Sequence, residues 1–152
     1  MIGRPTTEQV LRDCCRVLMD DVLPSVTDEP TQVRLVMLDK VLSNAAVRAG
    51  HEIAWMREET GAVEAYARTV AAATGDAGIA RALDELAGGP HESLHLDDVT
   101  EVYVRAGNLL SVSLEAALAA GRQDLTREGE SLLAARLAHE DAVVGGWDST
   151  GR

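Results

Sequence analysis

Nearly one helical phase of apolar residues runs through the first half of the chain, from residue 35 to residue 70. The positions that carry it are spaced by three, four or, once, seven residues: Leu35, Leu38, Leu42, Ala45, Ala49, Ile53, Met56, Val63, Ala67 and Val70. This spacing is typical of an α-helix with one apolar face. Gly50 and Gly61 weaken the helix propensity, at roughly 1 kcal/mol each relative to Ala, but they leave the phase intact. The pattern predicts one long helix of roughly 40 residues, straight or kinked. The alternative is two helices that break near Gly50 or Gly61, of which Gly61 is the better break point.

Shorter helical patterns flank this segment, and no strand pattern of period two persists. Helices are expected over residues 5–24, 76–86, 97–120 and 124–144, with Pro, Gly and Asp at their ends. The connections are short, which favours antiparallel packing of successive helices. The predicted fold is therefore all-α, a four-to-five-helix antiparallel bundle. The 152 residues are expected to form a single domain, 1–152, with loose tails at 1–4 and 146–152.

Composition limits the classes of partner. The chain has no Phe, and its aromatic residues are Trp55, Trp147, Tyr66 and Tyr103. Small aliphatic residues dominate instead, which favours closely packed helices. A net charge of −11 argues against nucleic acid and against anionic membrane surfaces as partners.

Three further features indicate a cytoplasmic protein. The first residues have no apolar segment of the kind found in signal peptides. No apolar run is long enough to span a membrane. Cys14 and Cys15 are neighbours in a helical pattern, where a disulfide between them would be strained, so they are expected to be reduced thiols.

The segment from Arg48 to Glu59 is the first candidate for a site. His51, Trp55 and Glu59 are spaced i, i+4, i+8 and so form one row on a helix. A functional interpretation places a pocket at four residues, with His51 as a base: His51, Glu52, Trp55 and Tyr103. A structural interpretation pairs Glu52 with Arg48 and makes Trp55 a packing anchor between helices or subunits. We favour the structural interpretation, with the His51 edge facing a second subunit.

Other reactive patterns are weaker. The single Glu-x-x-His, Glu92 to His95, lies in a Gly-Pro-flanked loop and has no second copy, so neither a metal nor another cofactor is predicted. His91, His95 and His139 are interpreted as exposed polar residues near helix ends. No Gly-x-Ser-x-Gly or phosphate-binding loop occurs. Trp147 is expected to fold back onto the bundle or to dock into a second subunit, and a solvated aromatic in the tail is the alternative.

Three stretches of the N-terminal third carry a family resemblance: residues 3–11, with Arg4-Pro5-Thr6; residues 18–24, with Asp21-Val22-Leu23-Pro24; and residues 38–53, with Arg48 to Glu52. They resemble a family of small bacterial all-helical domains of unknown function. Members of that family are often encoded beside aminoglycoside-phosphotransferase-like and acyl-CoA dehydrogenase-like proteins. The resemblance implies an accessory role in a metabolic pathway, with a phosphotransferase-like or acyl-CoA-handling protein as partner. It transfers no catalytic residue.

Two functions therefore remain open from the sequence. The first is a non-catalytic accessory or interaction protein that acts as a homo-oligomeric helical bundle, most simply a homodimer. The second is a small helical enzyme or small-molecule-binding protein with its pocket around His51, Glu52, Trp55 and Tyr103. Whether the chain is an enzyme is left undecided.

Overall fold

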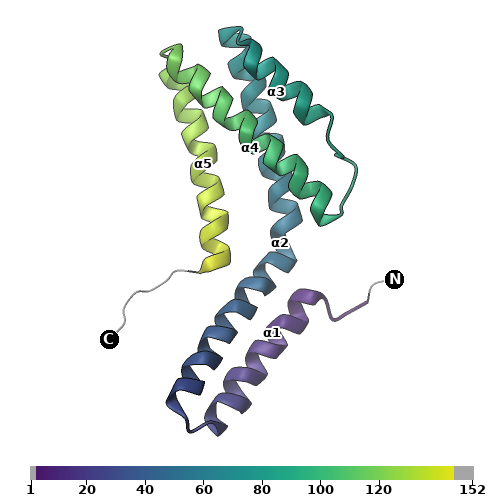
Figure 1. Ribbon diagram of the computed structural model, residues 1–152, viewed down its shortest axis with the longest axis vertical. Coiled ribbons are helices and arrows are strands. Elements are labelled where there is room, and N and C mark those ends of the chain that lie inside the picture. The colour runs from purple at the N-terminus through teal and green to yellow at the C-terminus, as the bar shows by residue number, and fades with distance from the viewer. Residues whose placement is uncertain (1–2, 146–152) are drawn as a thin grey trace. The chain divides into compact units, whose positions relative to one another are not determined.

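A computed structural model describes residues 3–145, and these fold as α-helices without a strand. The elements are α1 (Thr7–Val17), a π-helical turn (Leu18–Val22), a 3-10 turn (Leu23–Ser25), α2 (Glu29–Thr74), α3 (Ala77–Ala87), α4 (Leu96–Ala119) and α5 (Gln123–Val144) (Figure 1). The all-α prediction is confirmed. Within residues 3–145, none of the helices combines the length and the apolar character needed to cross a membrane.

The long helix predicted from the apolar phase is confirmed. α2 is helical over 46 residues and continues through both Gly50 and Gly61. Gly61 faces open space, whereas a Cβ built on Gly50 would lie 2.9 Å from the Glu8 carboxylate. The low helix propensity of the two glycines is thus overridden by the packing of their neighbours.

The ends of the shorter helices are set by local hydrogen bonds. Thr6 and Gln9 form a capping box at the start of α1, and Asp76 caps α3 through the backbone N–H groups of Gly78 and Ile79. The sequence predicts that α4 begins at Asp97, one residue after its observed start at Leu96. The N-cap is His95, and the Asp98 carboxylate accepts a hydrogen bond from the Ser93 hydroxyl at 2.6 Å.

The chain divides into two compact units, which we call the hairpin unit (Met1–Glu52 with Glu140–Arg152) and the core unit (Ile53–His139). α2 and α5 each contribute residues to both units. A single folding domain over 1–152 stays a prediction, because the division concerns compactness and not independent folding.

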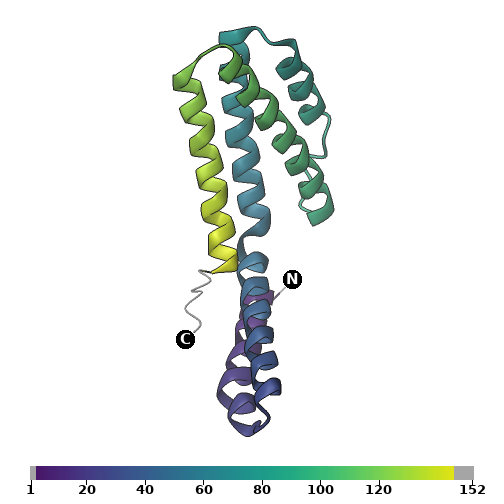
Figure 2. The ribbon, with the colours of Figure 1, turned by 60° about the vertical axis from the view of Figure 1, so that its left-hand side comes forward.

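In the hairpin unit, α1 lies along the first part of α2 (Figures 1 and 2). The Cys15 Sγ lies 3.4 Å from the Ser43 hydroxyl, and Glu8 contacts α2 at Gly50. Ala46 is the one residue of this unit that is fully buried within the described part of the chain. Two helices alone do not enclose a core here.

The core unit packs the second part of α2 with α3, α4 and most of α5 (Figure 2). Its interior is made of aliphatic side chains together with Tyr66: Val63, Tyr66, Ala67, Val70, Ile79, Ala82, Leu86, Val102, Ala106, Leu109, Leu110, Ala117 and Leu125. Tyr66 is 1% exposed, and its ring packs where α5 has Gly129. A Cβ at Gly129 would lie 2.4 Å from Leu114 Cδ2 and 2.8 Å from the Tyr66 hydroxyl, so a larger residue at this position would force one of these side chains to shift.

Candidate functional site

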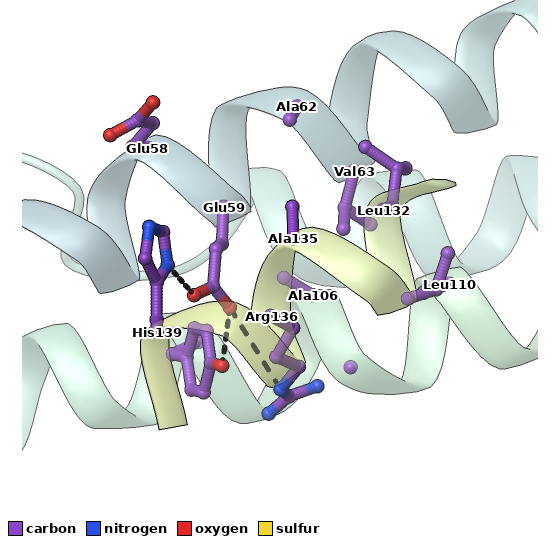
Figure 3. A pocket seen from close by; sticks show the side chains of 12 residues that line it. Glu58, Glu59, Ala62, Val63, Ala106, Leu110, Leu132, Ala135, Arg136 and His139 are labelled. Carbon is purple, nitrogen blue, oxygen red and sulfur yellow. Dashed lines mark hydrogen bonds and ion pairs between the residues drawn. The ribbon is translucent and has the colours of Figure 1, made fainter. Parts of the chain in front are cut away.

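Glu59 of α2 lies at the centre of a hydrogen-bonded network in the core unit (Figure 3). Its Oε2 accepts a hydrogen bond from the Tyr103 hydroxyl of α4 at 2.5 Å. Its Oε1 lies 2.7 Å from Nδ1 of His139 on α5, and Arg136 Nε lies 3.8 Å from Oε2. The Glu59 side chain is only 14% exposed. One carboxylate therefore connects three helices through groups that stabilise its negative charge.

Two ring contacts hold the partners of Glu59 in place. The Arg136 guanidinium carbon lies 4.5 Å above the centre of the Tyr103 ring, in cation–π geometry. Trp55, one helical turn before Glu59, stacks on His139 with ring centres 4.6 Å apart and planes inclined by 9°. An ionised carboxylate can only accept, so His139 donates from Nδ1 when Glu59 is charged.

A small cavity of about 90 Å³ lies beside this network, between α2, α4 and α5. Most of its wall is apolar, and the polar groups are gathered at one end (Figure 3). The lining residues are Glu58, Glu59, Ala62, Val63, Tyr103, Ala106, Gly107, Leu110, Leu132, Ala135, Arg136 and His139. An apolar recess with a few convergent polar groups is the usual form of a small-molecule site.

The chemistry that this arrangement can support is limited. A carboxylate bonded to a histidine is the base and orienting group of many hydrolases. However, none of the twelve residues that line the cavity is a serine, threonine or cysteine. Within residues 3–145, no three side chains of the types His, Cys, Asp and Glu gather in a way that could hold a metal ion. The arrangement combines an apolar recess with a carboxylate, a phenol, an imidazole and a guanidinium, and it has no hydroxyl or thiol of Ser, Thr or Cys in its lining.

Of the four residues predicted to form one pocket, Tyr103 lines this cavity, and His51, Glu52 and Trp55 do not. Trp55 and Tyr103 both contact partners of the Glu59 network. Glu52 belongs to the hairpin unit, where its carboxylate accepts a hydrogen bond from Arg48 at 2.8 Å, as the structural interpretation expects. His51 is exposed and does not line the cavity. Trp147 lies outside the described residues.

Two members of the site were missed by the sequence reasoning. His139 was expected to be exposed, which is wrong: its side chain is 28% exposed and bonded to Glu59. Arg136 was not selected at all. The available signal was the spacing of Leu132, Ala135, Arg136 and His139, which places them on one face of a helix that points at the core.

A second candidate region is a group of exposed apolar residues on the hairpin unit. Val33, Met37 and Val41 recur at i, i+4, i+8 on α2 and are 55%, 63% and 62% exposed. Val36 and Leu38 extend this row on either side, and we call these five residues the α2 face. On α1, the exposed residues Val10, Cys14 and Val17 form a second row, the α1 stripe. Apolar patches of this kind mark contact surfaces when they are contiguous.

Comparison with known proteins gives no relative for either region. No protein-family model matches the chain, and neither a curated protein nor a solved structure matches it. The two regions are therefore interpreted from their own residues.

Proposed function

We propose that this protein is a non-catalytic interaction protein that acts as a homodimer, and that its hairpin unit is the surface on which two copies join. The supporting observation is that α1 and the first part of α2 bury only Ala46 fully, while five large apolar side chains of the α2 face remain exposed. A two-helix unit of this kind acquires a core when a second pair of helices covers it.

The exposed apolar area is sufficient for association. The α2 face together with Val10 and Val17 supplies seven side chains per copy that are roughly half exposed. Burying the remaining half of each contributes about 1 kcal/mol, or roughly 10–15 kcal/mol for both copies together. The loss of translational and rotational freedom costs about 4–15 kcal/mol. A dimer that forms at micromolar concentration lies within this range.

Charge favours one arrangement of the two copies. Residues 7–25 contain four acidic and two basic side chains, whereas residues 30–50 contain one acidic and three basic side chains. The α2 face of one copy is therefore complementary to the α1 stripe of the other. Under two-fold symmetry this contact occurs twice and produces a four-helix bundle.

An accessory role in a bacterial metabolic pathway is part of the proposal, with a phosphotransferase-like or acyl-CoA-handling protein as the further partner. It is supported by the resemblance in the first third of the chain, within residues 3–53.

The test is the mass of the protein in solution, measured by light scattering after size exclusion at 1–100 μM. The wild type is expected at twice 16.2 kDa. Met37→Asp, which places a charge at the centre of the α2 face, is expected to give the monomer mass with unchanged helical circular dichroism. Leu137→Asp is the matched control, because Leu137 is 60% exposed on α5 in the core unit. A monomeric wild type at 100 μM, or a dimer that Met37→Asp leaves intact, would overturn the proposal.

A cysteine already present in the chain tests the arrangement. Cys14 is exposed in the α1 stripe, and Cys15→Ser removes the only other thiol. In that variant, Cys14 is expected to react with a maleimide more slowly as protein concentration rises, and Met37→Asp should abolish the dependence. A dimer in which Cys14 reacts at one rate throughout would contradict contact through the α1 stripe.

A further inference from the structure

The cavity beside Glu59 arises because small residues occupy the point where three helices meet. Ala62 of α2, Ala106 and Gly107 of α4, and Ala135 of α5 stand where larger side chains would fill the space. Ala62 and Ala135 are themselves exposed, so the cavity opens to solvent between α2 and α5. Leu110, Leu132 and Val63 form its apolar floor (Figure 3).

The polar end of the cavity offers hydrogen-bond donors. The Arg136 guanidinium is fixed by the Tyr103 ring and by the Glu59 carboxylate at 3.8 Å. Within residues 3–145 the structure records no hydrogen bond from this guanidinium, although it carries five N–H groups. Glu59, in contrast, already accepts from Tyr103 and lies within hydrogen-bond distance of His139. A molecule in the cavity would therefore meet N–H donors of Arg136 that have no hydrogen-bond partner among the described residues, whereas the Glu59 oxygens are already paired.

The charges around the cavity and its size limit the class of molecule that it can bind. An anion at Arg136 would lie close to the Glu59 carboxylate, which is 3.8 Å from the guanidinium, and a cation would lie close to Arg136 itself. A neutral molecule avoids both repulsions and needs only one acceptor atom. A cavity of about 150 Å³ is known to hold benzene, so 90 Å³ suits a shorter chain.

We propose that this cavity binds a short neutral aliphatic molecule, of roughly four or five non-hydrogen atoms, whose carbonyl or hydroxyl oxygen accepts a hydrogen bond from Arg136. The alkyl part lies against Leu110, Leu132 and Val63. This assignment is independent of dimer formation, because every residue of the cavity belongs to the core unit.

The experiment is an amide NMR titration of the full chain with three probes of equal chain length: butan-2-one, butyrate and n-butylammonium. Butan-2-one is expected to shift the amides of Ala62, Gly107 and Ala135 in a saturable manner, with a dissociation constant between micromolar and millimolar. Butyrate and n-butylammonium are expected to bind at least tenfold more weakly. Stronger binding of either charged probe, or no saturable shift with butan-2-one, would overturn the assignment.

Variants test the position and the donor. Ala135→Leu fills the cavity and is expected to weaken the binding of butan-2-one at least tenfold. Ala134→Leu, at the neighbouring exposed position of α5, is expected to leave that binding unchanged. Ala62→Leu provides a second filling variant if Ala135→Leu does not fold. Arg136→Met is expected to weaken the binding of butan-2-one about fivefold, whereas xenon, an apolar probe, should still bind. Equal binding of butan-2-one to the wild type and to a folded filling variant would contradict a site in this cavity.

Discussion

The two units of the chain use the same kind of helix and reach opposite degrees of burial. Both share α2, and valines of that single helix are 55% exposed at position 33 and fully buried at position 70. The difference lies in what covers them. Residues 63–70 pack against α3, α4 and α5, whereas residues 33–41 belong to a unit in which α1 covers one side of α2. The apolar pattern of a helix therefore determines which of its faces can be buried, and the number of neighbouring helices determines whether that face is buried.

Charge follows the same division. The core unit, residues 53–139, contains fourteen acidic and seven basic side chains, while the hairpin unit, residues 1–52 with 140–152, contains eleven and seven. The core unit thus carries a net charge of −7, and the hairpin unit, which has the exposed apolar face, carries a smaller net charge of −4. Low net charge lowers the repulsion between two copies that meet at the hairpin unit.

The largest difference between the units is expected for truncation of the two valines in α2. Val70→Ala removes two methyl groups from the core and leaves a cavity, so the free energy of unfolding should fall by about 2–3 kcal/mol. Val33→Ala should lower it by less than about 0.5 kcal/mol in dilute protein, because the side chain is largely solvated. Urea unfolding at 1 μM measures both. Equal losses would show that the hairpin unit has a core of its own.

The next effect compares two glutamates of α2. Glu59→Gln leaves Tyr103, His139 and Arg136 around a neutral amide, and the free energy of unfolding should fall by about 2–3 kcal/mol. Glu52→Gln breaks a surface pair with Arg48 and should cost about 0.5 kcal/mol or less. Thermal unfolding of the two variants side by side checks this. A cost for Glu52→Gln that matches that for Glu59→Gln would remove the distinction between a buried network and a surface pair.

The smallest expected effect is an increase in the free energy of unfolding. The Tyr66 hydroxyl is buried and has no hydrogen-bond partner among the described residues. Tyr66→Phe should therefore raise the free energy of unfolding by about 1 kcal/mol at pH 7. Gly129→Ala, which crowds the same ring, should lower it by about 1–3 kcal/mol. Destabilisation by Tyr66→Phe would show that the hydroxyl has a partner.

The same residue gives a pH dependence. Burial, with a smaller contribution from the charge of Glu128, raises the pKa of Tyr66 above its usual value. The unfolded chain ionises from about pH 10 upward, so the contribution of Tyr66 to stability is complete below that pH and is lost as the pH rises through the folded pKa. Tyr66→Phe lacks this loss, and its advantage over the wild type should widen above pH 10. A constant difference between pH 8 and pH 11 would contradict the raised pKa.

Much of the fold could be predicted from local pattern, because it depends on local signals. The apolar phase from Leu35 to Val70 indicates α2, and Thr6 and Asp76 are caps that act over three residues. The Arg48–Glu52 pair follows from i, i+4 spacing alone. The division into two units could not be read in this way, because α2 continues through Glu52 and Ile53 without a local break.

The candidate site was predicted less completely because its contacts join distant parts of the sequence. Glu59 meets Tyr103 across 44 residues and His139 across 80, and no spacing rule connects them. Trp55 and Tyr103 were identified as rare aromatic residues, but their partners on α5 depend on how α5 packs. His51 shares a helical row with Trp55 but does not line the cavity, and Glu52 pairs with Arg48 one turn earlier.

The most direct test of the account is amide hydrogen exchange measured at several protein concentrations. We expect amides in α1 and in residues 29–46 of α2 to become more protected between 1 and 200 μM, because pairing of two copies covers them. Amides around Val63 and Val70 should keep the same protection throughout, since their core lies within one chain. Hairpin amides that are as protected as the core amides at 1 μM, with no dependence on concentration, would contradict the claim that the hairpin unit requires a second copy.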